Sequence, residues 1–323
     1  DSAGETHGHH TSSALLSMEA FDLVNDKSVF PDQLQYVDAW QPKRLFFNTG
    51  WWFYGSQENF AKADKSDMLK IDIGVYYPLK GLSNNEVASL ASSQHLCQGF
   101  GRLTQRGSQE EYIKFLKGEF PEDTSNLFSG IDTSWNRVEG GLAIGNILNK
   151  VEANFNFTDP SSHINELMEA YKLITNLKDS HWKTIKTKEV KAIIEACVGL
   201  YLEASANTPT ASNMSEVKLN LEVLNRSEKT IELISYTIPN LNEGISKKTK
   251  LTPNNKFNFE ETIRLTNAKN TAPYWLENKG TLGMYNVSDR TLIGFPETPR
   301  DIVVKFNLLI DNTPISFEKA VVY

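Results

Sequence analysis

The chain has 323 residues, of which 23% are charged and 40% hydrophobic, and a formal net charge of -7. This composition is ordinary for a globular protein, and the length allows two or three domains. Lysine and arginine are scattered singly, so we expect no nucleic-acid partner. No apolar run has the length of a membrane span. The two cysteines, Cys97 and Cys197, fall in separate predicted helices, and their placement does not favour a disulfide.

Residues 6–13 contain three of the six histidines, His7, His9 and His10. Hydroxyl residues that can cap a helix follow, and then apolar residues at helical spacing, so we predict a helix over residues 12–25. The histidines would lie in the loop that leads into this helix. The helix would fix one end of that loop. His7 and His10 can face one cavity from this loop. The pattern is compatible with a metal or catalytic site, and also with a purification tag or a solvated histidine cluster.

Strands and helices alternate over residues 1–108. We predict strands at 44–48 and 68–76, and a capping box at 83–86 that opens a helix to about Cys97. This order predicts an α/β layered domain, in which ligands bind at the carboxyl ends of strands.

An aromatic cluster, residues 51–54, follows the first of these strands. Such a cluster is either core or a platform for a sugar. Adjacent Trp51 and Trp52 favour the platform, because neighbours in an extended chain point to opposite sides.

Residues 109–206 are predicted to be a helical segment packed on this domain. Within it we predict a helix at 110–117 that ends at Gly118, and apolar residues at helical spacing over 164–177 and 190–201 indicate a helical core. Residues 207–213 have the composition of a linker. Beyond it the hydrophobic period becomes two, and short strands between turns predict an antiparallel β-sandwich domain over residues 213–323.

Six stretches carry a resemblance to a known family: residues 4–14, 40–46, 73–76, 95–101, 127–135 and 272–276. Over nearly the whole chain, they resemble the later part of a PIG-L/LmbE-type zinc-dependent N-deacetylase in its long bacterial form. The resemblance implies a Rossmann-like deacetylase domain, a hydrolase acting on linear amides and an N-acetylated amino sugar or glycoconjugate as substrate. It also favours a periplasmic or extracellular location, with any signal peptide upstream.

The resemblance assigns roles to particular residues. His10 matches the family's zinc ligand, and His7 matches the histidine that polarises the substrate carbonyl or stabilises the tetrahedral intermediate. His9 stands where short family members have aspartate. His95 and Gln98 match a His-x-x-Gln motif, with either a site-lining or a structural role.

Trp51, Trp52 and Tyr54 would face the sugar in such an enzyme, as the residues of the aromatic cluster best suited to the platform.

The family's His-Pro-Asp-Asp motif, which supplies two zinc ligands and the general base, is absent from the chain. A catalytic zinc needs about three protein ligands and an open position. We therefore expect the remaining Zn²⁺ ligands upstream of Asp1, in a missing N-terminal part of the same protein, and an inactive chain without them. The alternative is a non-catalytic carbohydrate- or protein-binding module.

Overall fold

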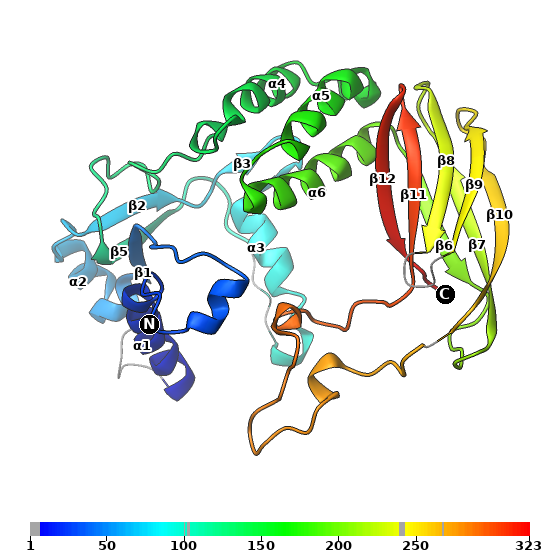
Figure 1. The fold of residues 1–323 in the computed structure, drawn as a ribbon. Coiled ribbons are helices and arrows are strands. Elements are labelled where there is room, and N and C mark those ends of the chain that lie inside the picture. Colours follow the sequence, from blue (N-terminus) through cyan, green and yellow to red (C-terminus); the bar gives the residue numbers. More distant parts are fainter. Residues whose placement is uncertain (1–6, 100, 102–103, 239–242, 267) are drawn as a thin grey trace. The chain divides into compact units, whose positions relative to one another are not determined.

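The computed structural model describes residues 7–99, 101, 104–238, 243–266 and 268–323. The chain forms two compact units, Asp1–Asp132 and Thr133–Tyr323, called here the first and the second unit. Both mix helices with antiparallel sheets (Figure 1). Gly4, Glu5, Thr6 and Phe100, which belong to the resemblance, lie outside the described residues. In the part of the chain that is described, no helix is long and apolar enough to cross a membrane.

The first unit is built on an antiparallel sheet of order β1-β5-β2, formed by Arg44–Thr49, Glu110–Gly118 and Met68–Asp72. The predicted helix at 110–117 is therefore wrong, because this segment is the central strand. Its aromatic and β-branched residues suit a strand, and it pairs with a neighbour on each side. Hydrogen bonding to a strand on each side outweighs the helix preference of its Glu and Lys residues, because tertiary context overrides intrinsic propensity.

Gly118 closes strand β5 and does not cap a helix. Its φ is 94°, and a Cβ atom there would lie 2.1 Å from the Lys43 carbonyl oxygen. The next residue, Glu119, donates its backbone N–H to that oxygen at 2.8 Å. Glycine is thus required by the close approach of this segment to the backbone of Lys43.

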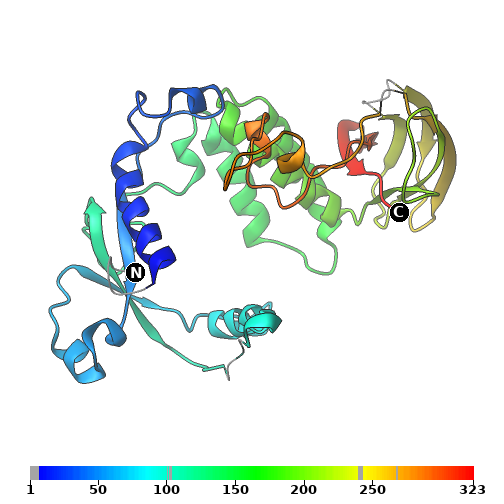
Figure 2. The ribbon, with the colours of Figure 1, turned by 90° about the horizontal axis from the view of Figure 1, so that it is seen from below.

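Helix α1, Gly8–Leu23, begins earlier than predicted and takes His9 and His10 into its first turn. The predicted apolar stripe does not face the core, since Leu15 and Leu16 are exposed. Ala14, Met18 and Phe21 are half-buried instead. The helix runs beside the sheet (Figure 2), where the Lys117 ammonium donates to the Met18 carbonyl at 3.1 Å.

The remaining elements of the first unit are short. The predicted capping box is confirmed, since Ser83 and Glu86 bond reciprocally at the start of helix α3, Asn84–Ser92. This helix ends before Cys97, which lies in a separate 3-10 turn. The other elements are η1 (Pro31–Gln35), η2 (Trp51–Tyr54), α2 (Gln57–Lys62), β3 (Tyr76–Tyr77), β4 (Leu82–Ser83) and η3 (Leu96–Gln98).

The second unit opens with helices. These are η4 (Trp135–Arg137), α4 (Gly141–Ala153), η5 (Pro160–His163), α5 (Ile164–Thr175) and α6 (Ser180–Cys197). The predicted helical faces of α5 and α6 are confirmed, with Ile164, Leu167 and Ile194 fully buried. Helix α6 ends at Cys197 and not at Tyr201, because Gly199 adopts a φ of 57°.

Two antiparallel sheets follow, of order β10-β7-β6 and β12-β11-β8-β9. Their strands are β6 (Tyr201–Ala206), β7 (Glu216–Leu224), β8 (Ile231–Ile238), β9 (Glu243–Lys250), β10 (Phe257–Arg264), β11 (Val303–Ile310) and β12 (Thr313–Ala320). The two-residue hydrophobic period predicted beyond the linker is confirmed in β7 and β11. Residues 201–206, predicted as part of the helical segment, instead form a strand that pairs with β7.

Burial alternates residue by residue along β7 and β11, as a two-residue period requires. The buried side chains of both sheets and of α4, α5 and α6 belong to one hydrophobic core. Two short 3-10 turns, η7 (Tyr274–Leu276) and η8 (Arg290–Leu292), lie in the long connection from β10 to β11.

Candidate functional site

The predicted histidine site lies at the start of helix α1. His7 is the N-cap, with extended backbone angles, and its carbonyl accepts the N–H of Thr11 at 3.2 Å. The His7 and His10 ring centroids are 4.3 Å apart, with their planes at 84°. Residues three apart at a helix start lie on one side of the helix, so the structure brings together the two imidazoles that the spacing paired.

His9 lies farther from His7 than His10 does. Its ring centroid is 6.2 Å from that of His7, and all three imidazoles are exposed. The first turn of a helix presents unpaired backbone N–H groups and the positive end of the helix dipole. This environment favours a negatively charged group next to the imidazoles.

The aromatic cluster of residues 51–54 divides into two parts. Trp51 and Trp52 stack on each other, with centroids 5.6 Å apart and planes 16° apart, and they are 47% and 67% exposed. Phe53 instead packs on Phe47 at 4.9 Å, and Tyr54 packs on Phe60 at 5.1 Å. In this 3-10 turn the first two residues are exposed and the next two are half-buried.

His95 and Gln98 lie at the two ends of the 3-10 turn η3. The His95 Nδ1 and Gln98 Oε1 atoms are 3.1 Å apart. Gly99 then turns the chain with a φ of 65°. The two side chains are therefore in contact with each other, and both are exposed.

The described residues do not contain a group of three or more His, Cys, Asp or Glu side chains arranged to hold a metal ion. His7 and His10 therefore do not form a complete zinc site with other described residues, since about three protein ligands are needed.

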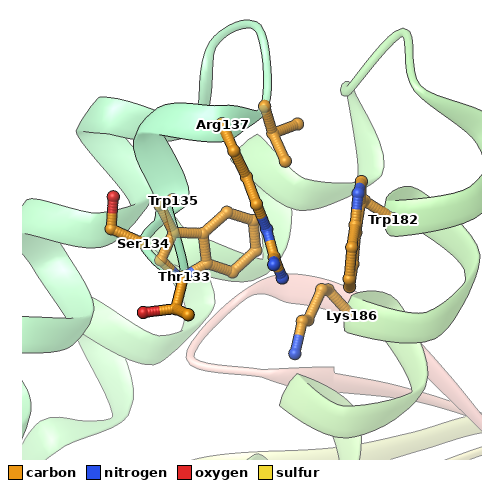
Figure 3. Close-up of a pocket in the computed structure, with 7 residues that line it drawn as sticks. Thr133, Ser134, Trp135, Arg137, Trp182 and Lys186 are labelled. Carbon is orange, nitrogen blue, oxygen red and sulfur yellow. The ribbon is translucent and has the colours of Figure 1, made fainter. Parts of the chain in front are cut away.

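A second cluster of functional interest was not singled out in the sequence. Arg137, Lys186, Trp135 and Trp182 line a pocket in the second unit (Figure 3). Trp182 and Lys186 are four residues apart on helix α6, a spacing that places them on one helix face. Arg137 joins them only through a tertiary contact, in which its guanidinium lies over the Trp182 ring, and the local pattern does not reveal this contact.

Comparisons with known proteins add little to this geometry. Neither a protein-family model nor a curated protein matches the chain. Among solved structures, the alkylpurine DNA glycosylase AlkC of Pseudomonas fluorescens, bound to DNA containing an abasic site analogue, gives a TM-score of 0.21 at 8% identity. The match covers 55% of this chain and 50% of that one, so the aligned part spans about half the length of the glycosylase. A likeness at this level carries no argument about fold or function.

Proposed function

We propose that the chain is part of a PIG-L/LmbE-type zinc-dependent N-deacetylase, an amidohydrolase that removes the acetyl group from an N-acetylated amino sugar or glycoconjugate. The first unit would be the later part of the Rossmann-like deacetylase domain, and the sheets of the second unit would form the β-sandwich. The observation that carries the proposal is the His7–His10 pair, with ring centroids 4.3 Å apart at the start of α1.

In this proposal His10 is one zinc ligand, and His7 donates a hydrogen bond to the acetamide oxygen as negative charge develops on it. The bound zinc would supply a Lewis acid and an activated water. The family's His-Pro-Asp-Asp motif would supply the remaining ligands. The positive end of α1 would add to the stabilisation of the charged intermediate.

The sugar ring would rest on the indoles of Trp51 and Trp52. Their parallel, exposed faces offer the flat apolar surface against which the C–H groups of a pyranose pack. Tyr54, which packs on Phe60, and the His95–Gln98 pair complete the proposed substrate-binding residues.

Three substitutions test the roles of the histidines, in the protein expressed with any natural sequence that precedes Asp1. His10→Ala should lose both zinc and acetate release, because the coordination shell is left one ligand short. His7→Ala should keep the zinc while kcat falls about 10²–10³-fold, the usual cost of one oxyanion donor. His9→Ala is the matched control and should matter least. If His9→Ala removes the zinc and His10→Ala retains it, the assignment fails.

A metal measurement on the chain from Asp1 to Tyr323 tests the ligand count. We expect weak zinc binding, because the family pattern places only His10 among the ligands in this stretch. Elemental analysis after dialysis against a chelator should find little zinc. A stoichiometric, tightly held ion would contradict this expectation.

The second candidate function is non-catalytic carbohydrate binding, favoured by the exposure of the stacked Trp51–Trp52 pair. Binding of an N-acetylglucosamine oligosaccharide without zinc, lost in Trp51→Ala and Trp52→Ala, would support it if acetate release is also absent. Trp40→Ala is the control, because Trp40 is also exposed, at 70%, and lies outside the pair.

A further inference from the structure

The pocket in the second unit is small, with a volume of about 70 Å³. Its wall is formed by Trp135 and Arg137 of η4, Trp182 and Lys186 of α6 and the neighbouring Thr133. The volume is well below the roughly 300–1,000 Å³ of pockets that take drug-sized ligands. It therefore suits a compact group and not a whole large molecule.

Glycines of helix α4 let Trp135 lie directly against that helix. A Cβ atom at Gly141 would lie 2.1 Å from the Trp135 carbonyl oxygen, and one at Gly145 would lie 3.0 Å from the Trp135 Cβ. The chain of η4 is thus held close to α4, and the Trp135 side chain is half-buried. This side of the pocket is fixed by packing.

The opposite side is fixed by the start of helix α6. The Asp179 carboxylate accepts the backbone N–H of Trp182 at 2.9 Å and caps this helix. The Arg137 guanidinium lies over the Trp182 ring, 4.1 Å from its centroid. Stacking on an aromatic face orients the guanidinium plane and leaves its N–H edge for an acceptor.

Two cations meet at this pocket. The Lys186 ammonium lies 5.7 Å from the Trp182 centroid, and Figure 3 shows it on the same side as the end of Arg137. Glu189 pairs with Lys186 at 2.7 Å and offsets part of its charge. Within the described ranges, Arg137 has no carboxylate partner and donates no hydrogen bond. An oriented guanidinium with open donors beside an ammonium is the arrangement that recognises oxyanions.

We propose that this pocket binds a phosphate group, either as inorganic phosphate or as the phosphate of a small phosphomonoester. Arg137 supplies two parallel N–H donors, and Lys186 adds a point charge. The pocket size favours the phosphate itself as the buried part. The lining residues named here all belong to the second unit.

The test follows the indole N–H signals of the chain by nuclear magnetic resonance during titration with inorganic phosphate, a hexose 6-phosphate and the free hexose. Trp→Phe variants assign the six tryptophan signals. We expect the signals of Trp135 and Trp182 to shift saturably with both phosphates and not with the hexose. A tighter Kd for the hexose phosphate identifies a phosphomonoester site, and equal values identify a phosphate site.

Variants separate a phosphate site from a structural cation. Arg137→Gln should raise Kd by at least about tenfold, because a charge-assisted bidentate contact is lost. The Kd of Arg137→Lys should lie between that of Arg137→Gln and that of the parent chain, since the positive charge remains but the planar guanidinium with its paired donors does not. Arg226→Gln is the control, because Arg226 also stacks on an aromatic ring, Tyr201 at 5.4 Å, outside the pocket. Absent shifts in the parent chain, or an unchanged Kd in a folded Arg137→Gln chain, would overturn the proposal.

Discussion

The two units differ sharply in how much apolar surface they bury. In the first unit, the buried hydrophobic side chains among the described residues are Met68 and Leu69. The second unit has a continuous core, in which Leu219 and Phe306 are 0% exposed. It also exposes Leu282 and Met284, but these lie in the connection from β10 to β11 and not in the core. Hydrophobic burial therefore stabilises mainly the second unit.

Local polar contacts hold much of the first unit. Arg44 donates to the carbonyl oxygens of Leu127 and Ser129, at 3.3 and 2.7 Å. Asp72 accepts from Gly74, Ser108 and Gln109 and ties the end of β2 to the start of β5. Each such contact contributes only about 0.5–1.5 kcal/mol net.

Thiol labelling should show the largest contrast between the units. Cys97 is exposed in the first unit, and Cys197 is buried in the second. Burial also raises the pKa of the Cys197 thiol, which lowers its thiolate fraction. We expect Cys97 to react at least about a hundredfold faster, because an opening free energy of about 3 kcal/mol gives that factor. Equal rates in single-cysteine variants would contradict the contrast.

Matched leucine truncations test the same comparison by stability. Leu219→Ala should lower the free energy of unfolding by about 2–5 kcal/mol, because a fully buried side chain leaves a cavity. Leu16→Ala, in α1 where Leu16 is 62% exposed, should change it by about 0.5 kcal/mol or less. Urea unfolding of both variants measures the difference. A similar loss in both would show that α1 buries its apolar side.

Glycine substitutions test the tight contacts of the first unit. Gly118→Ala should destabilise it by more than about 2 kcal/mol, because a positive φ and a clash with the Lys43 carbonyl act together. Gly81 also has a positive φ, of 66°, but no atom lies near the new Cβ, so Gly81→Ala should cost only about 1–2 kcal/mol. Hydrogen exchange of peptides from β1 and β5 measures the effect. Equal effects would show that the Lys43 carbonyl moves away from the new Cβ at little cost in free energy.

We expect the smallest effect for the loss of stability of the first unit at low pH. Hydrogen bonds from the backbone N–H groups of Gln109 and Gly74 and from the Ser108 hydroxyl lower the pKa of Asp72. Its contribution to stability is therefore present above the ordinary aspartate pKa and is lost as the pH falls through the lowered value. Asp72→Asn should weaken this acid dependence in hydrogen exchange of β2 and β5. Asp289→Asn, in the second unit, should leave the acid dependence of hydrogen exchange in β2 and β5 unchanged.

The sequence alone determined the features that depend on local spacing. The two-residue period identified strands β7 and β11, the capping box identified the start of α3, and the three-residue spacing paired His7 with His10. These features follow from the pitch of a helix and the pleat of a strand, which act over a few residues.

Only the tertiary structure decided features that depend on distant neighbours. Residues 110–118 form a strand because β1 and β2 supply hydrogen bonds on both sides, and Gly118 is required by the Lys43 carbonyl and not by a helix end. Likewise, the Arg137 guanidinium of η4 lies over the Trp182 ring of α6, a residue 45 positions further along the chain. Pairing and packing partners lie tens of residues away along the chain, and no local pattern of residues specifies them.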